Sequence, residues 1–79
     1  MYEKQIRLHS AGEVIRFNKI INKYPYDMDI RIGHIYIDAK SIMGLFSLDI
    51  SKSLTLIIHA EQSECLDELW EQLNIFIEK

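Results

Sequence analysis

The amino-acid sequence predicts an α+β domain whose elements follow the order β-α-β-β-α-β-α. Residues 2–9 and 28–37 alternate between apolar and polar residues, as half-buried strands do, and 54–59 is a short apolar, β-branched run. Two further segments repeat apolar residues every three or four positions, as amphipathic helices do. This order predicts a four-stranded antiparallel sheet with its helices on one face. Because 79 residues suffice for one small core, we expect a single domain over residues 1–79.

The first strand is expected over residues 2–9, where apolar residues alternate with polar ones. Directly after it, Ser10 and Glu13 have the spacing of a capping box. In such a box Ser10 accepts a hydrogen bond from the Glu13 amide, and the Glu13 carboxylate accepts one from the Ser10 amide. Apolar residues at helical spacing follow, so we expect a helix over about residues 11–23. Pro25 ends this run because proline lacks an N–H and clashes with the preceding turn.

The middle of the chain predicts a β-hairpin over residues 28–37, with Gly33 supplying the backbone freedom that the reversal needs. A short second helix is expected after Ser41. Residues 54–59 are apolar enough for a central strand or one covered by a helix. A polar stretch at 61–64 precedes the last helix. The apolar face predicted for that helix consists of Leu66, Leu69, Trp70, Leu73, Phe76 and Ile77.

Composition and charge exclude several classes of protein. Nine basic and twelve acidic residues give a net charge of −3 without a basic cluster, which argues against binding to nucleic acid. The most apolar run, Leu54–Ile58, is far shorter than the roughly 20 residues that span a bilayer. Cys65 is the only cysteine, so no internal disulfide forms, and we expect it to pack as a small buried residue. The beginning of the chain lacks the pattern of a signal peptide, so we expect a cytoplasmic protein.

The sequence also lacks the side-chain patterns of a catalytic or metal site. His9, His34 and His59 are not spaced as metal ligands, and a single cysteine does not complete a zinc site. No nucleophile–base pair, glycine-rich phosphate loop or pair of carboxylates stands out. We therefore expect no metal, no cofactor and no enzymatic activity.

The most specific stretch of the sequence runs over residues 40–48. Ser41 precedes a short apolar segment and is expected to cap a helix by accepting from the N–H of Met43 or Gly44. The free amides and the dipole at such a helix start also favour a phosphate. This stretch resembles the regulatory-serine segment of HPr, the phosphocarrier of the bacterial sugar phosphotransferase system, and of its regulatory paralogue Crh.

The resemblance implies the HPr fold, an open-faced β-sandwich in which three helices cover one face of a four-stranded antiparallel sheet. It implies that Ser41 is the target of a dedicated serine kinase of the HPr type. It further implies that the modified protein binds a LacI-type catabolite control repressor. The partner-binding surface would consist of Ile42, Leu45 and Phe46, beside the phosphorylated serine.

The sequence departs from HPr at the start of the first helix. HPr carries its phosphate there on a histidine within a Gly-Leu/Ile-His-Ala-Arg-Pro segment, which is missing from this chain. The loop is shorter by about five residues, within the range by which loops vary. Glu13 also places a carboxylate where a phosphoryl group would lie, and like charges oppose one another strongly at short range. We therefore expect a Crh-like regulatory protein and not a histidine phosphocarrier.

Two alternatives stay open. In the first, His9 is the phosphoacceptor of a phosphocarrier that receives its phosphate from enzyme I, with Arg7 and Arg16 as phosphate partners. The sequence favours an ordinary exposed histidine, because no arginine and proline follow it. In the second, the chain is an HPr-shaped interaction module that is never phosphorylated and binds a partner through its apolar surface.

Overall fold

The structure is a computed structural model that describes residues 1–61 and 64–78. Its elements are β1 (Tyr2–Ile6), α1 (Ala11–Ile21), β2 (Asp27–Ile32), β3 (Ile35–Asp38), α2 (Ile42–Phe46), β4 (Leu54–His59), α3 (Glu64–Leu73) and the 3-10 turn η1 (Asn74–Phe76). This is the predicted order of strands and helices, followed by one additional turn. Residues 62 and 63 of the predicted polar stretch lie outside the described residues.

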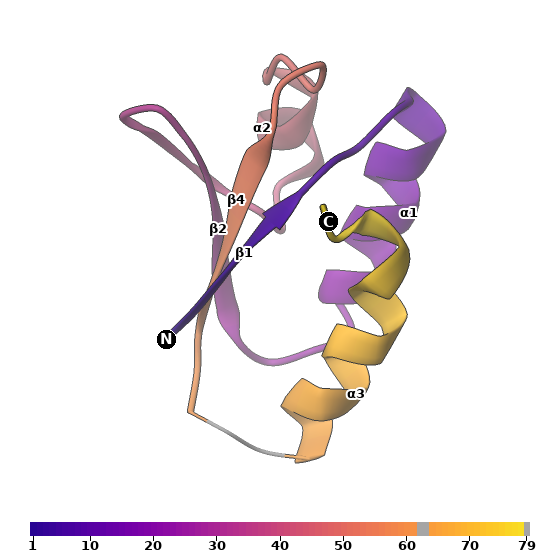
Figure 1. The fold of residues 1–79 in the computed structure, drawn as a ribbon, viewed down its shortest axis with the longest axis vertical. Coiled ribbons are helices and arrows are strands. Elements are labelled where there is room, and N and C mark those ends of the chain that lie inside the picture. Colours follow the sequence, from indigo (N-terminus) through magenta and orange to yellow (C-terminus); the bar gives the residue numbers. More distant parts are fainter. Residues whose placement is uncertain (62–63, 79) are drawn as a thin grey trace.

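The four strands form one antiparallel sheet in the order β1-β4-β2-β3. β4 lies inside the sheet, where Leu56 is opposite Lys4 of β1 on one side and Ile30 of β2 on the other. β2 and β3 form the predicted hairpin, and Gly33 at its turn has a φ of 59°, a conformation that glycine adopts without a steric penalty. α1 and α3 lie together on one side of the sheet (Figure 1). The predicted four-stranded sheet with one helical layer is confirmed.

The helices and the inner face of the sheet share one apolar core. Leu54, Leu56 and Ile58 alternate along β4 and have no exposed surface. Phe17 of α1 and Phe76 of η1 meet edge to face, with ring centroids 5.8 Å apart. Aromatic pairs of this geometry stabilise a core by about 0.5–1.5 kcal/mol beyond their buried area. The core therefore ties the central strand to both long helical segments.

The end of the described chain covers the outer edge of β1. Ile77 forms an isolated antiparallel bridge with Ile6, and the N–H of Arg7 donates to the carbonyl of Phe76 at 2.8 Å. The sequence placed Ile77 on the apolar face of the last helix, and this prediction is wrong. α3 ends at Leu73, and the chain then turns and extends along the strand. Around residues 5–7 this edge is therefore not available for pairing with another strand.

The boundaries of two elements and the environment of the cysteine differ from the predictions. β1 ends at Ile6 instead of residue 9, and α1 ends at Ile21 instead of residue 23. Cys65, expected to be buried, is exposed at the start of α3. The neighbouring Leu66 and the later Leu69 fill the inward side of this helix, so position 65 faces outward.

We expect Gly44→Ala to destabilise the fold, although alanine is the better helix former. A Cβ atom at Gly44 would lie 2.6 Å from Cγ2 of Ile37, so α2 and β3 would have to move apart. The free energy of unfolding, measured by urea titration, should fall by about 1–3 kcal/mol. The matched control is Gly12→Ala in α1, where the nearest atom to the new Cβ is Ser10 Oγ at 3.7 Å and no loss is expected. Wild-type stability in the Gly44 variant would contradict this account of the α2–β3 contact.

Candidate functional site

Ser41 is the N-cap of α2, as predicted. Its Oγ accepts the N–H of Gly44 at 3.2 Å, and its carbonyl accepts the N–H of Leu45 at 3.0 Å. The residue has extended backbone angles, φ −86° and ψ 111°, and is half-buried. A helix of five residues does not form alone in water. The position of Ser41 therefore depends on the packing of α2 against α1 and β3.

The charged residues that precede Ser41 are engaged within the protein. Lys40 Nζ donates to the carbonyl of Tyr24 at 2.6 Å, and the backbone N–H of Lys40 donates to Asp38 Oδ1 at 3.0 Å. The ammonium group of Lys40 therefore lies beside the segment that follows α1. Neither of these contacts involves the hydroxyl of Ser41.

Two of the three residues predicted for the partner-binding surface are at least partly accessible. Phe46 is 50% exposed and Ile42 is half-buried, whereas Leu45 is 1% exposed and belongs to the core. The prediction for Leu45 is therefore wrong, because α2 packs on α1 and β3 and Leu45 fills its inward side. Met43, which the sequence pattern did not indicate, is 81% exposed and lies three residues before Phe46, a spacing that places both on neighbouring turns. We call Ile42, Met43 and Phe46 the α2 surface.

The start of α1 is closed by its own side chains. Ser10 Oγ accepts the N–H of Glu13 at 3.1 Å, as the capping-box prediction states. The Glu13 carboxylate reaches one residue further than predicted: Oε1 accepts the N–H of His9 at 3.0 Å and lies 3.3 Å from Nδ1 of the same histidine. The hydrogen bond from the His9 backbone is the main reason why the pKa of Glu13 is lowered from 4.5. A negative charge is therefore held beside the imidazole.

Of the two arginines proposed as phosphate partners of His9, Arg7 is engaged elsewhere. Arg7 Nη2 donates to the carbonyl of Ser51 at 3.0 Å, in the turn before β4. Arg7 Nε is buried and has no hydrogen-bond partner among the described residues. Arg16 lies close enough to Glu13 to contribute a small lowering of its pKa. The structure thus pairs the His9 region with a carboxylate and directs Arg7 elsewhere.

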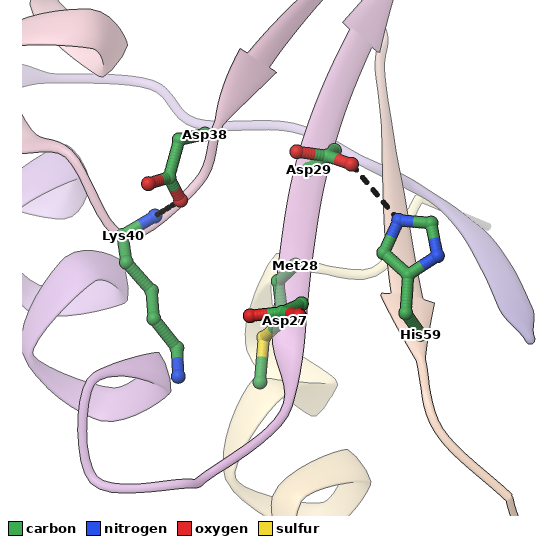
Figure 2. A pocket seen from close by; sticks show the side chains of 6 residues that line it. All are labelled: Asp27, Met28, Asp29, Asp38, Lys40 and His59. Carbon is green, nitrogen blue, oxygen red and sulfur yellow. Dashed lines mark hydrogen bonds and ion pairs between the residues drawn. The ribbon is translucent and has the colours of Figure 1, made fainter.

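A pocket of about 640 Å³ lies at the beginning of β2 (Figure 2). Its lining consists of Asp27, Met28, Asp29, Asp38, Lys40 and His59. His59 Nε2 lies 2.8 Å from Asp29 Oδ2, and Asp29 is directly opposite Asp38 in the β2–β3 register. The sequence does not reveal this acidic pocket, because Asp38 reaches Asp27 and Asp29 only through the pairing of β3 with β2.

Two kinds of site are missing from the part of the chain that the structure describes. No group of histidine, cysteine, aspartate and glutamate side chains there could hold a metal ion. No described helix has the length and apolar character needed to cross a membrane.

Three comparisons relate this chain to known proteins. A family model described as the PTS HPr component phosphorylation site matches residues 8–79, which is most of the chain. No curated protein matches the chain in sequence. Among solved structures, HPr from Thermoanaerobacter tengcongensis is 23% identical with a TM-score of 0.72, covering 92% of this chain and 90% of that protein.

Two further solved structures are similar over nearly their whole length. The phosphocarrier protein HPr from Bacillus anthracis is 22% identical, with a TM-score of 0.69, and the match covers 98% of this chain and 96% of that protein. Crh from Bacillus subtilis is a catabolite repression protein solved as a domain-swapped dimer. It is 27% identical with a TM-score of 0.64, and the match covers 95% of this chain and 88% of that protein. The fold and the family model agree. The chain belongs to the HPr phosphocarrier family of the phosphotransferase system, a family of proteins that are not enzymes.

Proposed function

We propose that this protein is a regulatory member of the HPr family that is phosphorylated on Ser41 and is not a histidine phosphocarrier. The modifying enzyme would be a serine kinase of the HPr type, and the partner of the modified protein a LacI-type catabolite control repressor. The location we propose is the cytoplasm, in line with the HPr family. The observation that carries the proposal is the contrast between the two helix starts: Ser41 lies beside the exposed α2 surface, whereas Glu13 closes the start of α1.

Phosphorylation of Ser41 would change the surface that a partner contacts. A phosphate adds about −1.5 to −2 charges at neutral pH together with strong acceptor oxygens. These oxygens would lie beside Met43 and Phe46, which are 81% and 50% exposed. A partner with one basic group and one apolar pocket could then distinguish the modified protein from the unmodified one. Leu45 takes no part in this contact because it is buried.

The similarity to Crh supports a regulatory role more than a carrier role. That protein is described by its involvement in catabolite repression, and it is 27% identical to this chain. The two HPr structures are each less than 25% identical and support the fold. The regulatory proposal therefore combines the Ser41 segment, the geometry of its cap and the likeness to Crh.

A carrier role for His9 is the second candidate, and one observation favours it. The His9 side chain is 68% exposed and lies just before α1, near the place where HPr carries its phosphate. Against it, the Glu13 carboxylate lies 3.3 Å from Nδ1, where a phosphoryl group on that nitrogen would meet a like charge. An unphosphorylated interaction module that uses the α2 surface is the third candidate.

We expect a serine kinase of the HPr type with ATP to add one phosphate to the purified protein at Ser41, detected by mass spectrometry. Ser41→Ala should abolish the labelling. Ser10→Ala is the matched control, because Ser10 is also an N-cap serine that accepts from the amide three residues later. Labelling that persists in Ser41→Ala, or no labelling of wild type while an ordinary HPr is modified, would contradict the proposal and favour the interaction module.

We expect enzyme I and phosphoenolpyruvate to leave the protein unlabelled, since Glu13 occupies the space beside His9. An ordinary HPr in the same assay is the positive control, and acid-labile phosphate is the species to measure. An acid-labile phosphate on His9 that disappears in His9→Ala would establish the carrier role instead.

We expect Glu13→Gln to lower the free energy of unfolding more at pH 7 than near pH 3. The folded protein lowers the pKa of Glu13 from 4.5, so its carboxylate stabilises the fold above that pH. This stabilisation is lost as the pH falls through the lowered pKa and the group becomes protonated. Urea titrations at both pH values measure the difference, with Glu71→Gln on the exposed side of α3 as the control. The same loss at both pH values would show that charge is not the cause.

A further inference from the structure

The backbone just before Ser41 is held by a side chain of α1. Asn18 Nδ2 donates to the carbonyl of Lys40 at 3.0 Å and to the carbonyl of Ala39 at 3.3 Å. Ala39 has no exposed surface, and both hydrogen bonds are partly buried. One amide group thus satisfies two consecutive carbonyls across about 20 residues of sequence.

Other contacts fix the same residue. Asn22 Nδ2 donates to the Lys40 carbonyl at 3.3 Å, and Asn22 is itself linked to Asn18, because its Nδ2 donates to the Asn18 carbonyl at 2.8 Å. Lys40 Nζ donates to the Tyr24 carbonyl, and its N–H donates to Asp38 Oδ1. The amide, the carbonyl and the ammonium group of Lys40 all therefore have partners within the fold.

These contacts decide where the hydroxyl of Ser41 points. α2 is too short to fix its own start, so the direction in which the chain enters the helix sets the cap. The carbonyl of Lys40 belongs to the peptide group that joins Lys40 to Ser41. Holding this carbonyl therefore orients the peptide plane from which Ser41 Oγ reaches the N–H of Gly44.

We propose that Asn18 is a positioning residue for Ser41. Its side-chain amide orients the peptide group before the serine, so that the hydroxyl keeps one direction at the start of α2 and is presented to a kinase in that direction. This inference rests on the proposed phosphorylation of Ser41. Asn18 touches neither the hydroxyl nor any transferred phosphate, and it acts only through the backbone of residues 39 and 40.

The first test measures hydrogen exchange of the Gly44 amide by NMR in the unmodified protein. Asn18→Ala removes the side-chain amide, and Asn18→Asp keeps its shape while removing the two N–H donors. In both variants we expect the Gly44 amide to exchange about tenfold faster, because the Ala39 carbonyl loses the donor from Asn18 and the Lys40 carbonyl keeps only the longer bond from Asn22, so the cap opens more often. Ser10→Ala is the matched control: it weakens the cap of α1 and lowers overall stability without touching residues 39 and 40. In this control the Gly44 amide should exchange as in wild type.

The second test measures phosphorylation of the same variants by the serine kinase. We expect kcat to fall about tenfold in both Asn18 variants while KM changes little, since Met43 and Phe46 remain on the surface to bind the enzyme. Ser10→Ala should keep the wild-type kcat.

The proposal is overturned if the Gly44 amide exchanges at the wild-type rate in both Asn18 variants, or if Ser10→Ala accelerates it by the same factor. It is also overturned if wild type is phosphorylated and the Asn18 variants are modified with an unchanged kcat. If wild type is not phosphorylated, the proposed function fails, and the hydrogen-exchange comparison still decides whether Asn18 positions Ser41.

Discussion

The structure depends on the burial of one face of β4. This strand lies between β1 and β2, and its inward residues Leu54, Leu56 and Ile58 are fully buried beneath the helices. In a chain of 79 residues a single core has to supply most of the stability. Helical elements add to the same cluster, for example through Phe17 of α1 and Phe76 of η1. Each helix is held against the sheet by the side that it buries.

The two helix starts differ in how much of their geometry is local. α1 has eleven residues and a cap closed by side chains adjacent in sequence, so its start is determined by residues 9–13. α2 has five residues, and its start is determined by Leu45 in the core, by the approach of Gly44 to Ile37 and by α1. A change in the packing between α1 and α2 therefore alters the geometry of Ser41, whereas the geometry at the start of α1 does not depend on that packing.

The sequence predicts the elements that carry a clear period and misses the contacts that only tertiary structure creates. The sheet, the hairpin at Gly33 and both serine caps follow from patterns of neighbouring residues. Leu45 was misplaced because five helical residues contain too little periodicity to reveal the buried side. Three contacts depend on how the chain turns or on which segments meet, so no local sequence pattern predicts them. They are the hydrogen bond between Glu13 and His9, the β-bridge at Ile77 and the hydrogen bond from Asn18 to Lys40.

Both caps use a serine that accepts from the amide three residues later, and the residue that supplies this amide makes the difference between them. At α1 that residue is Glu13, whose carboxylate turns back over the helix start. At α2 it is Gly44, and the fold allows nothing larger without a shift, because a Cβ there would lie 2.6 Å from Ile37 and 3.4 Å from Ser41 Oγ. The close packing of α2 on β3 thus excludes the very side chain that would complete a capping box. The hydroxyl of Ser41 remains free of a competing carboxylate for the same steric reason that α2 can lie against the sheet.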